Sequence, residues 1–238
     1  MNWSKPIKLV TATRNSIITK SRIWNVIRKL EKTEEWATLP PDGFPRFPFI
    51  AKDITDNTKG LPEVYNKFIT PENKDYILLF VHDDVDIIDL NLLKNLREGL
   101  TEYDIIGLAG VNGPIQLKSP SGWHLMGQRE QMSGSVYHRD KNTNQIWSTS
   151  FGPMPKRVLL IDGLFMAINT EKILAAGVKF DEQFKFHHYD IDFCLSANKA
   201  GLKIGTWPIP VIHDGLGTSM LTDEWKISDK LFLKKWLK

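Results

Sequence analysis

The alternation of short apolar runs with helical patterns is the feature that most constrains how this chain can fold. The run at 76–81 is continuous and uncharged, as expected of a strand that is covered on both faces. Strands that alternate with helices form a mostly parallel central sheet flanked by helices, so we predict an α/β fold. The expected strands are 7–13, 47–51, 76–81 and 103–109, and the expected helices are 15–35, 62–69 and 90–100.

The second half of the chain is more irregular. Residues 110–155 are rich in Gly, Pro, Ser and Asn with scattered aromatic residues, which predicts long loops with at most a small hairpin. Loops of this length are uncommon unless they carry function. Regular structure is expected again as strands at 158–161, 164–168 and 203–212 and helices near 170–176 and 189–200. We treat residues 1–238 as a single domain.

Composition excludes several classes of protein. The 238 residues carry 31 Lys+Arg against 28 Asp+Glu, and a net charge of +3 is too small for binding nucleic acid by charge alone. The longest uncharged apolar run, at 76–81, is far shorter than the roughly 18 residues of a membrane span. The chain has one cysteine, Cys194, and its first residues lack the apolar core of a signal peptide. We therefore expect a cytoplasmic protein.

A cluster of carboxylates directly follows the apolar run at 76–81. Asp83, Asp84 and Asp86 come where an open α/β sheet usually binds its ligand, at the carboxyl end of a strand. Adjacent carboxylates repel each other, and a hard divalent cation such as Mg²⁺ or Mn²⁺, completed by diphosphate oxygens, would join them. The charge pattern alone leaves an equal alternative, a solvated turn with a helix cap.

Four segments together resemble the GT-A nucleotide-sugar glycosyltransferases. ILLFVHDDVDI is similar to the strand and aspartate motif of that fold, and its His-x-Asp-Val form is similar to a bacterial branch of the family-two-like group. IKLVTATRN resembles the first strand and donor-binding turn. LIDGLFMAINTEKI with FDEQFKFHHYDIDFCLSANKAGLKIG resembles the acceptor-side segment and its Asp-x-Asp helix, and PIPVIHDGLG the final strand. The matches span residues 7 to about 217 in the family's order.

This resemblance implies a GT-A fold with a nucleotide-binding half at about 1–110, an acceptor-side half at about 111–220 and a basic amphipathic tail at about 222–238. It also implies a metal site and a donor site. The implied metal ligands are Asp84, His213 and Asp83, and the implied donor-binding residues are Thr11, Thr13, Arg14, Asp53 and Asp83. Asp86 also forms an Asp-x-Asp motif with Asp84, so its omission from the implied metal ligands is a judgement. The chain departs from many relatives at His82, where they have an acid.

A second pair of carboxylates, Asp190 and Asp192, lies at the start of an expected helix. At 100° per residue they point to nearly opposite sides, so only one is expected to face a reaction. Without the resemblance, Asp190 reads as a helix cap and Asp192 as a surface residue. With it, Asp190 is the implied base that takes the proton of the acceptor hydroxyl. The implied acceptor or sugar pocket consists of Asp162, Gly163, Tyr189, Asp192 and His188, and Tyr189 stands where many relatives have Glu.

The tail SDKLFLKKWLK would form a helix with an apolar stripe flanked by lysines. Packing of the stripe against its own domain is the commoner outcome for such a helix. The alternative is peripheral contact with an anionic membrane, where lipid-linked acceptors reside.

Taken together, we expect a glycosyltransferase that depends on Mn²⁺ or Mg²⁺. It would move a sugar from a nucleotide-diphosphate donor to a hydroxyl of a glycan or lipid-linked acceptor, with inversion, in surface glycan or polysaccharide assembly. One alternative is a nucleotidyltransferase acting on sugar phosphates, although its usual Gly-rich first loop is missing from TATRNSIITK. Another is a non-catalytic glycan-binding module on the same fold.

Overall fold

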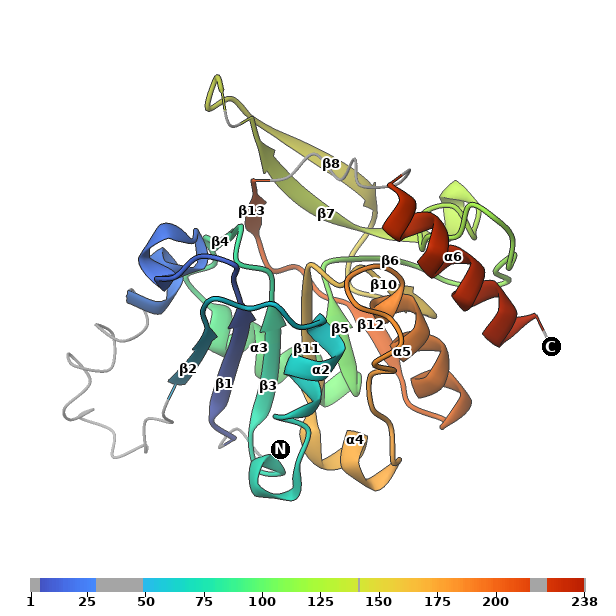
Figure 1. Ribbon diagram of the computed structural model, residues 1–238, viewed down its shortest axis with the longest axis horizontal. Coiled ribbons are helices and arrows are strands. Elements are labelled where there is room, and N and C mark those ends of the chain that lie inside the picture. Colours follow the sequence, from blue (N-terminus) through green and yellow to red (C-terminus); the bar gives the residue numbers. More distant parts are fainter. Residues whose placement is uncertain (1–4, 29–48, 141, 215–221, 238) are drawn as a thin grey trace.

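The computed structural model describes residues 5–28, 49–140, 142–214 and 222–237. Within them, a central sheet of seven strands has the order β2-β1-β3-β11-β5-β12-β9 (Figure 1). β11 is antiparallel to both of its neighbours and β9 is antiparallel to β12, whereas the other five strands share one direction. The predicted mostly parallel α/β fold is confirmed. The strands are β1 Ile7–Ala12, β2 Phe49–Ile54, β3 Ile77–Val81, β5 Ile105–Gly107, β9 Lys156–Val158, β11 Phe165–Asn169 and β12 Ile204–Thr206.

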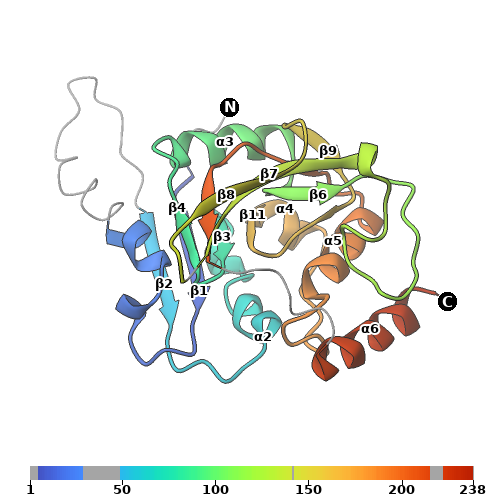
Figure 2. The same ribbon diagram turned by 90° about the horizontal axis from the view of Figure 1, so that it is seen from above.

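Helices cover both faces of this sheet. Seen from above, α3 lies on one side of the strands, and α2 and α5 lie on the other (Figure 2). Every residue of β3 is buried, which explains its continuous apolar sequence. The helices of the domain are α2 Leu61–Asn66, α3 Leu92–Glu102, α4 Thr170–Ala175 and α5 Tyr189–Lys199, in addition to helical residues 23–28.

A second sheet crosses the carboxyl ends of the central strands (Figure 1). Its order is β10-β6-β7-β13-β4, and β8 pairs with the outer part of β7. β4 follows β3 after three residues, and β6 follows β5 after one, so the central strands feed directly into the second sheet. The strands are β4 Val85–Ile87, β6 Ala109–Val111, β7 Met132–Arg139, β8 Ile146–Gly152, β10 Leu160–Ile161 and β13 Val211–His213.

The structure corrects two of the expected elements. Residues 112–131 are mostly loop, as expected, but the hairpin of β7 and β8 is long rather than small. β8 has the sequence IWSTSFG and is largely exposed, and it shows no apolar alternation. The single strand expected at 203–212 is two strands in different sheets, β12 and β13. Pro208 and Pro210 lie between them, and proline cannot donate to a strand ladder.

The first expected helix, at 15–35, is also interrupted. The structure has a short 3-10 turn at Ile18–Lys20 and helical residues 23–28, and residues 29–35 of the prediction lie outside the described residues.

The tail forms the helix α6, Asp223–Trp236, which packs on its own domain. Thr222 caps it by accepting a hydrogen bond from the Trp225 backbone N–H, and Trp225 and Phe232 are buried on its inner face. Ile227 remains exposed on the outer face. Across the described part of the chain, the structure has no helix that combines the length and apolar character of a membrane span.

Candidate functional site

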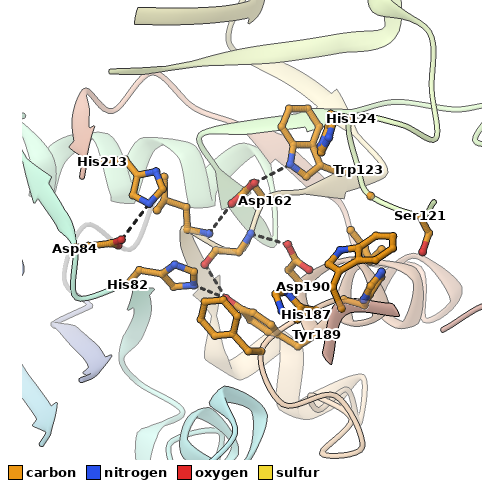
Figure 3. A pocket seen from close by; sticks show the side chains of 17 residues that line it. His82, Asp84, Ser121, Trp123, His124, Asp162, His187, Tyr189, Asp190 and His213 are labelled. Atoms are coloured by element: carbon orange, nitrogen blue, oxygen red, sulfur yellow. Dashed lines mark hydrogen bonds and ion pairs between the residues drawn. The ribbon is translucent and has the colours of Figure 1, made fainter. Parts of the chain in front are cut away.

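A cavity of about 380 Å³ opens where the central strands meet the second sheet (Figure 3). Side chains from distant segments line it, including both of the acidic clusters that the sequence singled out. Asp84 and His213 lie on one side and Ser121 lies on the other, with Asp162 and Asp190 between them (Figure 3). The lining residues are His82, Asp84, Ser121, Gly122, Trp123, His124, Asp162, Gly163, Leu164, Phe186, His187, His188, Tyr189, Asp190, Ile191, His213 and Trp225.

Asp84 and His213 form an ion pair at the cavity wall. The imidazole Nε2 of His213 lies 3.3 Å from the Asp84 Oδ2 atom, and the pairing of β13 with β4 holds the two residues together. Burial alone would lower the pKa of His213, but the Asp84 carboxylate raises it overall. Burial likewise opposes ionisation of Asp84, yet His213 keeps the pKa of that carboxyl below its ordinary value.

This pair has the donor chemistry of a divalent-metal site. A carboxylate oxygen and an imidazole nitrogen are ligands that Mn²⁺ accepts. The other carboxylate oxygen of Asp84, Oδ1, is buried and has no hydrogen-bond partner among the described residues. A buried oxygen without a partner is costly unless something else binds it, so the pair fits a cation. No group of three potential ligands gathers anywhere in the described residues, so the pair alone would leave most of the coordination shell to other molecules.

Asp83 lies with the first strand rather than with Asp84 and His213. Its Oδ2 atom is 3.5 Å from the Ser21 hydroxyl, which in turn lies 3.2 Å from the Thr13 hydroxyl oxygen. Asp83 is not among the residues that line the cavity. The structure therefore brings together two of the three expected metal ligands and places the third beside the expected donor segment.

The expected donor residues are partly assembled at the end of β1. Thr11 and Thr13 are buried, and the Thr11 hydroxyl has no hydrogen-bond partner among the described residues. Arg14 is exposed and lines an open cleft of about 440 Å³ together with Lys59. The backbone of Asp53 pairs with Thr11 across β1 and β2, while its side chain lies outside the described residues.

Asp190 and Tyr189 contact the turn at Gly163. The Gly163 backbone N–H donates to the Asp190 Oδ2 atom at 2.9 Å, and the Tyr189 hydroxyl donates to the Gly163 carbonyl at 2.9 Å. His82 Nε2 lies 2.9 Å from the same hydroxyl and donates to it, because the hydroxyl hydrogen is already used. A Cβ at position 163 would collide with the Tyr189 hydroxyl, which explains why glycine occupies it.

Asp190 has an environment that holds its proton. Burial, and then the nearby charge of Asp162, raise the pKa of Asp190 to about 7. Asp162 is fixed by two donors, the Trp123 indole N–H at 2.7 Å and the Leu164 backbone N–H at 2.8 Å. A carboxyl whose pKa lies near neutrality is suited to exchange a proton at physiological pH.

The other expected pocket residues have different surroundings. Asp192 is fully buried on the opposite side of α5, where it accepts hydrogen bonds from Lys235 and from the Trp236 indole. Only Asp190 of the pair therefore faces the cavity. His188 reaches the cavity edge, but its ring packs against Trp225 and Phe232 of α6.

Sequence reasoning missed several lining residues. Ser121 and His124 lie in a segment without periodic pattern, and Trp225 belongs to a helix that was assigned to the tail. The one local signal was Trp123, an aromatic residue in the irregular half. The rest reach the cavity only through tertiary contacts, which no short-range pattern reveals.

Comparison with known proteins gives one family. Residues 52–236 match the model of a family described as Glycosyltransferase like family. Among curated proteins, none matches the chain significantly in sequence.

Several solved structures resemble the chain at low sequence identity. The crystal structure of GalNAc-T7 with UDP, GalNAc and Mn²⁺ has a TM-score of 0.51 and 14% identity, over 89% of this chain and 44% of that one. TarS 1–349 of S. aureus has a TM-score of 0.45 and 14% identity, over 88% and 60%. A197 from STIV has a TM-score of 0.42 and 14% identity, over 84% and 81%. This chain thus covers less than two thirds of the first two. The likeness to GalNAc-T7 confirms the expected GT-A fold.

The raised pKa of Asp190 predicts that replacing this residue by Asn stabilises the protein by an amount that depends on pH. Because the pKa rises from 3.8 to about 7 on folding, the stability contributed by the neutral carboxyl is present at low pH and is lost as pH rises through 7. Asp190→Asn should therefore raise the midpoint of thermal unfolding by roughly 5 °C near pH 8 and by little near pH 4. Glu102→Gln, at the end of α3, is the control. An equal effect of Asp190→Asn at both pH values would contradict this environment.

Proposed function

Because the chain belongs to the glycosyltransferase-like family and is an enzyme of that class, we propose that it transfers a sugar from a nucleotide-diphosphate donor to an acceptor hydroxyl. The observation that carries this proposal is the shared cavity. Asp84 and Asp190 lie more than a hundred residues apart in the sequence, yet they line the same space together with His213. Leaving-group stabilisation and proton abstraction, the two tasks of sugar transfer, can therefore take place on one substrate complex.

The donor side of the proposal rests on the end of β1 and on Asp84. The linked hydroxyls of Thr13 and Ser21 and the carboxylate of Asp83 offer polar contacts for the nucleoside. Arg14, exposed at the rim, can pair a phosphate. We assign Asp84 and His213 as the residues that hold Mn²⁺ or Mg²⁺, and the GalNAc-T7 structure contains Mn²⁺ beside UDP. When bound, the cation neutralises charge on the leaving diphosphate.

The acceptor side rests on Asp190. The Gly163 N–H engages its Oδ2 atom, which leaves Oδ1 to accept the proton of an acceptor hydroxyl. The proposed reaction is a single displacement: the deprotonated oxygen attacks the anomeric carbon while the bond to the nucleotide diphosphate breaks. A base on the acceptor side is what an inverting transfer of this kind requires.

We also propose a cellular setting. On the His-x-Asp-Val motif at 82–85 we propose membership of a bacterial branch of the family, and we propose surface glycan assembly as the pathway. The one cysteine, Cys194, is buried and unpaired, as in a reducing cytoplasm. The outer face of α6 carries exposed Ile227, Lys230 and Lys234 at helical spacing, which supports peripheral contact with the inner face of a membrane.

The metal assignment predicts that nucleotide binding depends on Asp84. UDP should raise the unfolding midpoint of the wild-type protein only in the presence of Mn²⁺, following the usual dependence on ligand concentration. Asp84→Asn should abolish this stabilisation and lower the turnover number at least about a hundredfold. Asp86→Asn, in the neighbouring strand, is the control. The released product distinguishes the two reactions, because sugar transfer releases UDP and nucleotidyl transfer releases pyrophosphate. Full activity of Asp84→Asn would refute the assignment.

The base assignment predicts a pH profile. Because Asp190 must be deprotonated to act, kcat/KM for transfer should rise with pH and level off above about 7. The negative charge of Asp162 contributes to the raised pKa, so Asp162→Asn should move the break in the profile to lower pH. Asp190→Asn should lose transfer and keep UDP binding. The assignment of Asp190 as the base is wrong if the break in the pH profile persists in Asp190→Asn, or if it does not move in Asp162→Asn.

The membrane assignment predicts binding to anionic vesicles. The wild-type protein should sediment with vesicles of phosphatidylcholine and phosphatidylserine, and not with phosphatidylcholine alone. Reversing both charges in Lys230→Glu/Lys234→Glu should weaken this binding at least about tenfold, since each lysine near an anionic surface contributes about 1 kcal/mol. Lys67→Glu/Lys94→Glu changes the net charge equally at other exposed positions. An equal loss in both double variants would show that no specific surface is involved.

A further inference from the structure

His188 has an unusual backbone directly before the cavity-lining residues of α5. Its φ is 64°, in the left-handed region, where a residue other than glycine is strained. This conformation sets the direction in which the chain enters α5, and the next two residues, Tyr189 and Asp190, point into the cavity. The strained position persists only if its surroundings hold it.

α6 supplies those surroundings. The imidazole Nδ1 of His188 lies 2.9 Å from the Ser228 hydroxyl, which donates to the His187 carbonyl at 2.8 Å. The ring stacks on Phe232 with centroids 5.6 Å apart, and Trp225 covers it at 5.0 Å. One face of α6 thus encloses both the ring and the backbone of the residue that starts α5.

Asp229, on the same face of α6, holds the opposite wall of the cavity. Its carboxylate accepts hydrogen bonds from the Ser119 hydroxyl at 2.7 Å, from the Ser121 backbone N–H at 2.8 Å and from the Ser121 hydroxyl. Burial alone would raise the pKa of Asp229, but the bonds from Ser121 and Ser119 lower it overall. Asp229 also lies 3.6 Å from His188 Nε2, a nitrogen that has no hydrogen-bond partner among the described residues, so the carboxylate packs beside this ring without bonding to it.

The wall that Asp229 holds is the segment that sequence reasoning missed. Ser121 to His124 line the cavity in succession, and Trp123 donates to Asp162, the neighbour of the proposed base. The segment has neither helix nor strand, and its own backbone supplies a turn in which the Leu125 and Met126 N–H groups donate to the Gly122 carbonyl. The bonds to Asp229 and Asp162 attach this turn to the rest of the domain.

The chemistry of the cavity indicates what this wall receives. Flat rings of Trp123, Trp225 and Phe186 line the cavity together with the polar side chains of Asp190 and His187. A sugar ring has apolar faces and a hydroxyl-rich edge, and mixed aromatic and polar surfaces match both.

We propose that α6 shapes an acceptor subsite for a sugar ring, in which Asp229 is the positioning residue that holds the Ser121–His124 wall opposite Asp190. The inference that the bound sugar is the acceptor rests on the proposed function, whereas the geometry of the subsite does not depend on it. A pre-shaped wall lowers the ordering cost of binding, so loosening it should weaken acceptor binding and spare the donor site.

The test measures binding without requiring transfer. Octyl β-glucoside and octyl β-galactoside serve as probes, and quenching of tryptophan fluorescence gives the Kd. Asp229→Ala should raise the Kd of the bound glycoside about tenfold, and Asp229→Asn, which keeps an acceptor oxygen, should stay within about threefold of wild type. UDP affinity with Mn²⁺ should change in neither variant. Asp223→Asn, at the exposed start of α6, is the matched control.

A second variant covers the case in which Asp229→Ala fails to fold. Ser119→Ala/Ser121→Ala removes two of the hydrogen bonds from the other side and leaves α6 intact, and it should weaken glycoside binding in the same way. Equal loss of glycoside and UDP affinity would overturn the proposal, because it would show a general structural role. It would also be overturned if neither glycoside bound the wild-type protein. Glycoside binding that depends on Asp229 in a protein that binds no UDP would instead reject the proposed function.

Discussion

The close contact of α5 with the turn at Gly163 is the constraint on which the cavity depends. Two hydrogen bonds join Gly163 to residues of α5 that lie 26 and 27 positions further along the chain. The Tyr189 hydroxyl donates to the Gly163 carbonyl, and the Gly163 N–H donates to Asp190. The Tyr189 hydroxyl also contacts His82 at the end of β3, so a single hydroxyl connects three elements. Any side chain at position 163 would separate them. The acidic strand end and the base can share one space because this position has no Cβ.

The carboxylates of the cavity differ in their proton affinity because their partners differ. Asp84 faces the His213 imidazole, and its pKa is lowered, so it stays anionic and available to a cation. Asp190 accepts a hydrogen bond from the Gly163 N–H and lies near the negative charge of Asp162, and its burial raises its pKa to about 7. Groups of one chemical type thereby acquire separate tasks, one electrostatic and one in proton transfer. The separation comes from neighbours that lie far away in sequence.

The sequence was sufficient where local pattern and burial agree. The continuous apolar run at Ile77–Val81 predicts the central strand and so the position of Asp84 at its end. It was insufficient where an element is defined by its partners. β8 is largely exposed, lacks an alternating pattern and is held as a strand by its pairing with β7, and β13 is separated from β12 because it joins another sheet. Ser121 and Trp225 belong to the site only because α6 packs beside α5, a contact that periodicity does not encode.

The way α6 is attached explains why it can define part of a site. Apolar contacts such as that of Phe232 are not directional, and by themselves they would allow the helix to shift along its axis. Two buried carboxylates prevent this shift. Asp229 lies within α6 and accepts a hydrogen bond from the Ser121 N–H, and Asp192 of α5 accepts hydrogen bonds from Lys235 and Trp236 near the end of α6. Burying a charge is costly unless its partners are in place, so each contact favours one position. The register of α6 that these bonds fix in turn sets the shape of the cavity wall.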